Sequence, residues 1–304
     1  MGGHRTKDRK RLSASVEARV AWCGELARWA LVRSDGWADP LPALPGSSFF
    51  LARDQLLWVT LELHTKHPRV VVTSTAMPRD RPLRFIGLPR RGWFFSTAAL
   101  PLDATEQFRA AAHRLCLTLH ADCTTASGFG ALLTGQALAF PLQGAQSHIG
   151  ILSQTLARDD PRGMLEASRA LIGFGTGLTP SGDDLLGGAL FARRFMARRD
   201  HRWRAVAMLL TQQLRARSHP VSAALFSDLA RGNGYEPLHR LAAALAVDDD
   251  ETAYKTARDL CTIGHSSGWD ILVGFILGTG NTFGHRCAAS ARASVSLTLL
   301  DSFF

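Results

Sequence analysis

The chain has 304 residues, of which 46% are hydrophobic, and a formal net charge of +9. Such a chain can bury a substantial core, which excludes a disordered protein and allows one large domain or two ordinary ones. No apolar run reaches the roughly 18 residues that suggest a membrane span, and the N-terminus lacks the apolar core of an export signal. We therefore expect a globular, cytoplasmic protein that does not bind a membrane.

The positive charge is concentrated in residues 1–33, with a net charge of +5, and residues 193–217, with a net charge of +7. Few aromatic residues lie among these basic residues, so nucleic-acid binding is not expected. A solvated face, an acidic partner subunit and the attraction of anionic substrates all remain open. The five cysteines are scattered without a Cys-x-x-Cys pair, which argues against a disulfide framework and a structural zinc site.

The order of sequence patterns predicts an α+β protein in three segments. Residues 1–45 are predicted to be a basic tail followed by a helix, because apolar residues recur with helical spacing over 13–32. Residues 46–104 are predicted to form a small, mainly antiparallel β-sheet or barrel, because short aliphatic and aromatic runs alternate with turn residues. These runs are 48–52, 55–63, 69–75, 83–88 and 93–98.

Residues 105–304 are predicted to form a larger all-α domain, because the apolar residues there take a helical period. The predicted helices are 105–120, 145–158, 161–172, 180–199, 201–217, 219–231, 236–246, 249–262 and 267–279. Proline or glycine lies near many of their boundaries. The stretch 288–304 could be a final helix or strand.

Two similar motifs lie in this helical segment. Residues 181–188 and 267–274 share Ser, Gly, a second Asp, a branched aliphatic residue, Leu and a final Gly. In each motif the serine stands three residues before an aspartate, Asp184 or Asp270, which is a capping-box spacing and predicts a helix start. Four residues after each aspartate comes a glycine, so two helices could cross tightly there and bring their N-terminal ends together.

A helix start presents free N–H groups and the positive end of the helix dipole, so an anion is its natural ligand. Three glycines at alternate positions precede the first motif, and they would let a ligand or another backbone approach. The alternative is that both motifs serve helix packing alone. The spacing is neither a dinucleotide-binding fingerprint nor a Walker A loop.

Residues 173–188 and 263–270, together with 218–232, resemble the AllH-like family. The resemblance implies a subunit of oxamate carbamoyltransferase, a transferase of allantoin breakdown and purine degradation that works with two other kinds of subunit. Its reaction would be the phosphorolysis of oxalurate to oxamate and carbamoyl phosphate. Thr176 replaces an expected proline and Ser218-His219-Pro220 replaces a threonine-rich stretch, so the specificity could differ.

This resemblance and the helix-start chemistry together give the predicted site. The backbone amides and hydroxyls expected to bind a small anion, with phosphate as a substrate, belong to Gly175, Gly177, Thr179, Ser181, Gly182, Ser266, Ser267 and Gly268. His265 could move a proton to the departing amide nitrogen or be a hydrogen-bonded loop residue.

The catalytic candidates also include three carboxylates, which repel an anion unless they act as caps, carry a proton or bind a cation. Asp184, matched by Asp270, is expected to be a cap, and Asp183 is the better candidate for chemistry or Mg²⁺. No cofactor or metal site is assigned beyond this Mg²⁺ option. The alternative function is a non-catalytic scaffold or small-anion-binding subunit that docks an acidic partner.

Overall fold

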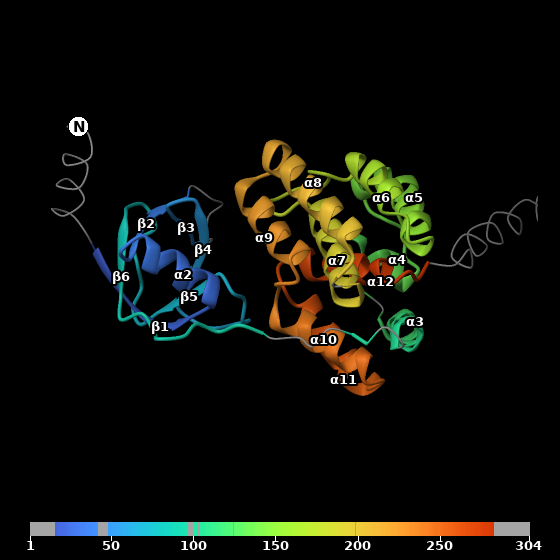
Figure 1. Cartoon of the computed structure of the whole chain (residues 1–304), viewed down its shortest axis with the longest axis horizontal. Helices are drawn as coiled ribbons and strands as arrows, with labels where there is room; N and C mark the ends of the chain where they lie inside the picture. The colour runs from blue at the N-terminus through green and yellow to red at the C-terminus, as the bar shows by residue number, and fades with distance from the viewer. Residues whose placement is uncertain are drawn as a thin grey trace, which may run out of the picture.

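The computed structural model describes residues 16–41, 48–95, 100–101, 104–123, 125–197 and 199–282. A small six-stranded barrel comes first in the chain and a larger helical part follows it, with the two side by side (Figure 1). The predicted order of a small β part followed by a larger helical part is therefore confirmed. The predicted segment boundaries at 45 and 104 stay a prediction.

The barrel closes in the strand order β1-β5-β4-β3-β2-β6. Its strands are β1 (Val16–Cys23), β2 (Trp37–Pro40), β3 (Phe49–Ala52), β4 (Gln55–Thr60), β5 (Val70–Thr73) and β6 (Leu83–Ile86). The pairs β1–β6 and β4–β5 are parallel, and the other four pairs are antiparallel. The expectation of a mainly antiparallel sheet is thus only partly right, because the barrel is mixed.

The helix predicted over residues 13–32 is wrong in its first half. Residues 16–23 form strand β1, and only α2 (Glu25–Arg33) is helical. In β1 the buried Ala18 and Val20 alternate with the exposed Glu17 and with Arg19, which is the period of two that a half-buried strand requires. The barrel therefore uses residues N-terminal to position 46. The tail predicted for residues 1–11 lies outside the described residues.

The helical part follows the predicted elements closely. Its helices are α3 (Thr105–Asp122), α4 (Ala131–Thr134), α5 (Gln146–Ala157), α6 (Pro161–Ala167), α7 (Ser181–Met196), α8 (His201–Arg217), α9 (Pro220–Ala230), α10 (Glu236–Ala246), α11 (Asp250–Cys261) and α12 (Ser267–Gly278). Short 3₁₀ segments η2 (Gly128–Gly130), η3 (Leu142–Ala145) and η4 (Ser168–Ala170) lie between them. Helix α4, η2 and η3 were not predicted as elements, whereas η4 lies within the predicted helix 161–172. The stretch 288–304 lies outside the described residues. No described helix is long and apolar enough to cross a membrane.

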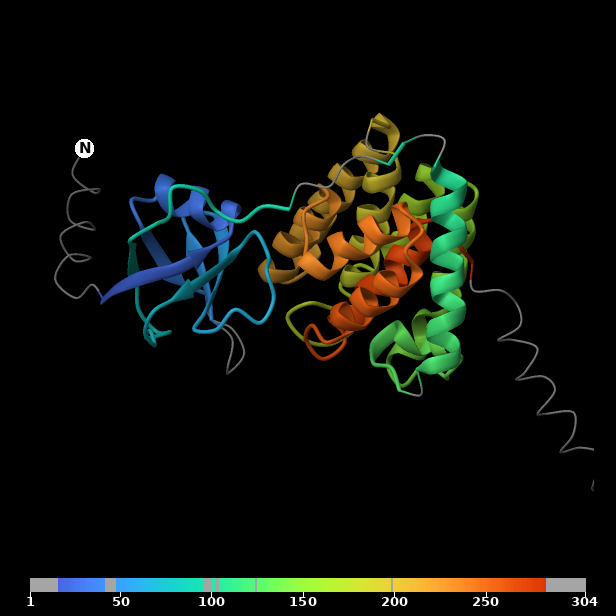
Figure 2. The same ribbon diagram turned by 90° about the horizontal axis from the view of Figure 1, so that it is seen from below.

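Helices α7 and α12 form the centre of the helical part. Nearly every residue of both is buried, and α12, drawn in red, lies among the other helices (Figure 2). A helix that is buried on all sides is a core helix rather than a surface one. The two repeated motifs open these two helices, so both motifs lie in the interior.

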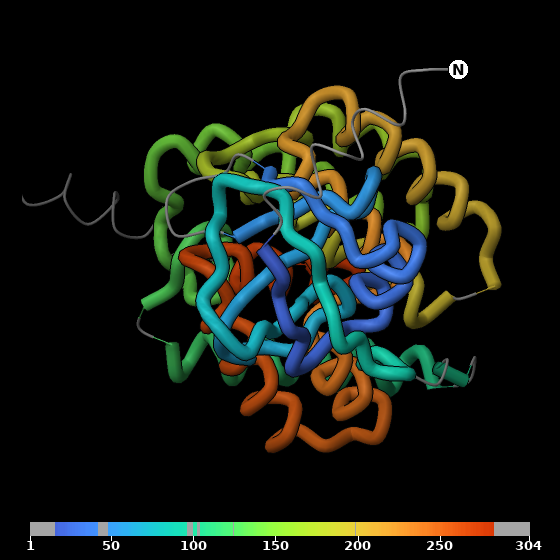
Figure 3. Tube along the Cα trace, turned by 90° about the vertical axis from the view of Figure 1, so that its left-hand side faces the viewer, coloured from blue at the N-terminus to red at the C-terminus, as the bar shows by residue number. Residues whose placement is uncertain are grey.

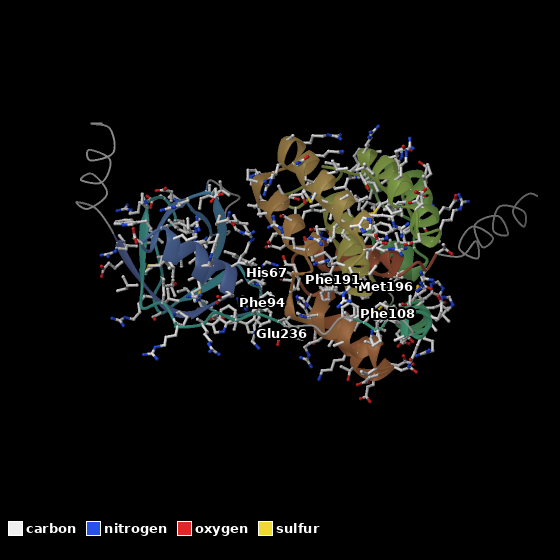
Figure 4. All side chains as sticks on the ribbon, viewed as in Figure 1. His67, Phe94, Phe108, Phe191, Met196 and Glu236 are labelled. Carbon is white, nitrogen blue, oxygen red and sulfur yellow. The ribbon has the colours of Figure 1, made fainter. Side chains whose placement is uncertain are left out.

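The barrel packs against α9 and the start of α10. Seen from the barrel end, the strands lie in front of these helices (Figure 3). Leu56 of β4 packs with Val221 and Leu225 of α9 in one small apolar cluster. His67 lies at this junction beside the helical part (Figure 4), and its ring is 4.8 Å from the ring of Tyr235, centroid to centroid.

Candidate functional site at the paired helix starts

Helices α7 and α12 touch each other through backbone at reciprocal positions. A Cβ atom added to Gly274 would lie 1.9 Å from the carbonyl oxygen of Leu185, and one added to Gly188 would lie 2.1 Å from that of Ile271. Only glycine leaves room for so close an approach. At the helix starts the Thr179 and Ser267 hydroxyls are 2.9 Å apart, and further along both helices Gly278 meets Ala189. The helices therefore run parallel with their starts together. The predicted tight crossing is confirmed.

The same reciprocity appears in the side chains of the two motifs. The Ser181 hydroxyl lowers the pKa of Asp270, and the Ser267 hydroxyl lowers the pKa of Asp184, so the serine of each motif acts on the aspartate of the other. Neither helix has a side-chain cap: Pro180, at the N-cap position of α7, has no side-chain acceptor, and Ser266, at that of α12, makes no capping hydrogen bond. The predicted capping boxes are therefore wrong. Each serine is already the first residue of its helix, and its hydroxyl acts on the aspartate of the other helix.

Asp184 and Asp270 are buried carboxyl groups with one oxygen each that lacks a partner. Their exposed fractions are 5% and 0%, and no hydrogen bond reaches the Oδ2 atom of either. Burial raises the pKa of Asp270 to about 6 against the hydrogen bonds from Phe129, Ser181 and Ser266. Burial, with the charge of Asp270 next to it, raises the pKa of Asp184 well above its usual range. Burial thus shifts both groups towards the protonated form.

Asp183 is instead a fully engaged structural side chain. Its Oδ1 accepts a hydrogen bond from the amide of Gly173 at 2.7 Å. Its Oδ2 accepts one from the Ser222 hydroxyl at 2.6 Å and another from the Ser218 hydroxyl. Asp183 therefore joins the loop that contains Gly173, Gly175 and Gly177, called the glycine loop below, to the start of α9. The expected roles are exchanged, because Asp184 and Asp270, expected as caps, carry the unsatisfied oxygens.

The glycine loop before α7 depends on left-handed backbone. Gly173, Gly175 and Gly177 have φ values of 73°, 113° and 95°, a region that side-chain-bearing residues rarely adopt. A Cβ on Gly175 would lie 2.8 Å from the amide nitrogen of Ser181, whereas one on Gly177 would meet no atom within 4 Å. Gly175 is required for packing as well as conformation, and Gly177 for conformation alone.

Two of the amides predicted to bind an anion are used inside the fold. The Gly182 amide donates to the carbonyl of Phe174 at 2.8 Å, and the Gly268 amide donates to the carbonyl of Ile263 at 3.0 Å. Both glycines also pack against backbone, because an added Cβ would lie about 2 Å from the carbonyl of Leu171 or Leu260. An anion at this site would have to use other donors of the predicted set.

Four predicted residues are more exposed than the buried carboxyl groups: Thr179, His265, Ser266 and Ser267. The hydroxyls of Thr179 and Ser267 are 2.9 Å apart, which joins the glycine loop to the start of α12. Thr179, Ser266 and Ser267 are half-buried, and His265 is exposed in the turn before α12. These hydroxyls are thus more exposed than the carboxyl pair, and the exposed His265 directly precedes Ser266 in the chain.

Two contacts of the carboxyl pair were not predicted. The amide of Phe129 in η2 donates to Asp270 Oδ1 at 2.6 Å, and a Cβ on Gly128 would lie 2.3 Å from that oxygen. The Gly-x-Gly spacing of η2 was the one available signal. On the other side, burial and then the charge of Asp184 raise the pKa of Tyr235, whose ring also meets His67 and Trp58 of the barrel. The site therefore adjoins the barrel.

A Mg²⁺ ion has little support from these side chains. Within the described residues no group of three or more His, Cys, Asp or Glu side chains is placed to hold a metal ion. The oxygens of Asp183, the expected Mg²⁺ ligand, already accept three hydrogen bonds.

The fold and the site define an α+β protein whose helical part is centred on a duplicated helix start. Residues 171–279, which include both motifs, match the family model described as oxamate carbamoyltransferase subunit AllH. The resemblance seen in the sequence is confirmed over this segment, and the family name indicates a multi-subunit complex. No curated protein and no solved structure gives a significant match to the chain.

Proposed function

We propose that the chain is a subunit of an oxamate carbamoyltransferase-like enzyme, in the phosphorolysis of oxalurate to oxamate and carbamoyl phosphate. The observation that carries the proposal is the reciprocal contact of α7 and α12, whose starts hold two buried carboxyl groups with unsatisfied oxygens and the paired hydroxyls of Thr179 and Ser267. The family match over residues 171–279 supports the reaction class. The partners would be the other subunits of that enzyme.

The residues suit the demands of this reaction. A phosphate oxygen must attack the carbamoyl carbon, the bond from that carbon to the oxamate nitrogen must break, and the nitrogen must gain a proton. The amides of Gly175 and Gly177 and the hydroxyls of Thr179 and Ser266 can hold the anionic groups. Donors at the second helix start can face the carbonyl oxygen as negative charge develops on it. His265 can serve as a proton donor at the surface of the site.

Calorimetric titration tests this proposal directly. Oxalurate, oxamate, phosphate or carbamoyl phosphate should bind to the chain, alone or assembled with its partner subunits. Gly177→Ala should weaken binding about tenfold, equivalent to about 1.4 kcal/mol, because it changes the conformation of the loop without filling space. Gly150→Ala, at a helical glycine with nothing within 4 Å, is the matched control and should bind normally. Absence of binding by all four compounds, even in the assembled complex, would contradict the proposal.

A non-catalytic scaffold subunit is the second candidate, and α8 favours it. This helix carries Arg202, Arg204, Arg215 and Arg217 and no acidic residue. Met208 and Leu209 on the same helix are 66% and 45% exposed. A basic surface with apolar side chains suits an acidic partner subunit.

The scaffold reading predicts an association with the partner subunits that weakens as salt is added. Arg204→Glu with Arg215→Glu should reduce copurification, because both arginines lie on the exposed side of α8. Arg81→Glu, on the barrel and exposed, is the control for a change of charge elsewhere. Association that is insensitive to salt and to the α8 variant would count against this reading.

A further inference from the structure

Asp184 and Asp270 each lie four residues before the glycine that contacts the other helix, so both side chains lie on the touching faces of α7 and α12. The groups that act on them are each other, the hydroxyls of both motifs, the Phe129 amide and the charge of Asp183. Tyr235, from the turn before α10, is the other titratable neighbour. Among the described residues no Lys, Arg or His side chain is one of these influences.

If Asp184 and Asp270 were both ionised, their two buried negative charges would have no cation in the described part of the chain to balance them. A buried charge needs a partner of opposite sign or a proton, and two carboxylates that share a site hold a proton between them. Among the described residues the two Oδ2 atoms are the buried carboxyl oxygens left without a donor, one on each helix. A single proton between the two groups would lower their combined charge from −2 to −1.

We propose that Asp184 and Asp270 hold one proton between them and deliver it through the Ser267 and Thr179 hydroxyls to a substrate at the helix starts. Two observations support this path: the Ser267 and Thr179 hydroxyls are 2.9 Å from each other, and both of them lower the pKa of Asp184 against the effect of burial. The two aspartates are positioning residues here, because they are buried and would act through these hydroxyls. This inference rests on the proposed function only for the identity of the substrate.

The proton balance closes in the proposed reaction without an external acid. As the bond from the carbamoyl carbon to the oxamate nitrogen breaks, its electron pair goes to that nitrogen. The nitrogen takes a proton from a hydroxyl, which takes the shared proton from the carboxyl pair. The attacking monohydrogen phosphate forms its bond to the carbamoyl carbon and loses its own proton, which returns to the pair. One proton leaves and one arrives in each turnover.

Infrared titration of the full-length protein with ¹³C-labelled aspartate tests the shared proton without any ligand. One band of a protonated carboxyl should persist from about pH 5 to at least about pH 7, where ordinary aspartates are ionised. The band should disappear in Asp184→Asn and in Asp270→Asn, and it should survive in the exposed control Asp54→Asn. Loss of the wild-type band below about pH 5, or its survival in both Asn variants, would overturn the proposal.

Comparison of Asn with Ala at position 270 separates proton sharing from packing. An amide can donate to the carboxylate of Asp184 as a protonated carboxyl does, so Asp270→Asn should melt within a few degrees of wild type. Asp270→Ala should melt well below it, because the Phe129 amide loses its acceptor. Equal loss in both variants would contradict the shared proton, and the wild-type titration remains decisive if neither variant folds.

The proton relay through the Ser267 and Thr179 hydroxyls has its own test in the assembled enzyme. Ser267→Ala should lower kcat for carbamoyl transfer about a hundredfold with little change in KM, because a positioned proton donor contributes roughly that much, and it should keep the infrared band. An unchanged kcat would refute the relay. If the wild-type protein shows the infrared band but its complex catalyses no carbamoyl transfer, the proposed reaction is contradicted and the shared proton still stands.

Discussion

Replacing Gly274 by alanine should reduce the free energy of unfolding by about 4 kcal/mol, which is large for a single methyl group. The added Cβ would lie 1.9 Å from the Leu185 carbonyl oxygen and 2.7 Å from its carbon. These are backbone atoms of a helix, so they cannot rotate away as a side chain would. The two core helices would have to separate. Gly188→Ala should have a similar cost, because its contact with Ile271 is the reciprocal one.

Urea denaturation of Gly274→Ala measures this cost, and Gly150→Ala provides its matched control. Gly150 lies within α5, and a Cβ there would meet nothing within 4 Å. Alanine is better than glycine in an open helical position, so the control should be stabilised by about 0.5–1 kcal/mol. If the free energy of unfolding falls in Gly274→Ala and rises in Gly150→Ala, the loss is due to the contact between α7 and α12. A Gly274→Ala protein as stable as wild type would mean that α7 and α12 do not touch here.

The helices could be predicted from sequence because their signals are local. The apolar period and the flanking proline or glycine gave α10 at its observed bounds and α8 at 201–217. Strand β1 was missed because Val16, Val20 and Cys23 also fit a helical period, and the alternation of Ala18 and Val20 with charged residues competes with it. Pairing with β5 and β6 decides between the two patterns. Such long-range pairing is not visible in one sequence.

The convergence of the two motifs could likewise be predicted, whereas the roles of their side chains could not. The repeated Ser-Gly-x-Asp and its glycine four residues on predicted two helices that touch, and they do. The capping spacing looks the same whether the serine binds its own helix or the other one. Asp183 looked free because its partners, Ser218 and Ser222, come from α9. Only the tertiary fold could show that Asp184 and Asp270 are the unsatisfied pair.

Loss of the Arg69 guanidinium should destabilise the protein by about 3–5 kcal/mol, because it would leave the buried carboxylate of Asp228 without its cation. Arg69 Nε and Nη2 both donate to Asp228, the latter at 2.9 Å, and Nη1 donates to the Leu56 carbonyl at 3.1 Å. The two side chains are 6% and 1% exposed. Arg69 belongs to the barrel side and Asp228 to α9, so this pair joins the two parts of the molecule.

Arg69→Met measured by urea denaturation, beside Lys66→Met, tests this pairing. Lys66 binds Glu236 at 3.1 Å across the same junction, but both side chains are about a third exposed, so its loss should cost less than about 1 kcal/mol. The double variant Arg69→Met with Asp228→Leu should recover much of the loss, because no charge remains buried. Similar costs for Arg69→Met and Lys66→Met would refute the buried pair.

The Arg69→Met variant should also change the candidate site. Helix α9 carries Asp228 and, at its start, Ser222, while Ser218 lies just before it, and both serines hold Asp183 and through it the Gly173 amide. If α9 shifts when Arg69 is lost, the glycine loop should be cut faster in limited proteolysis, whereas Lys66→Met should leave the rate unchanged. An unaltered rate of loop cleavage in a destabilised Arg69→Met protein would show that the barrel and the glycine loop are not coupled through α9.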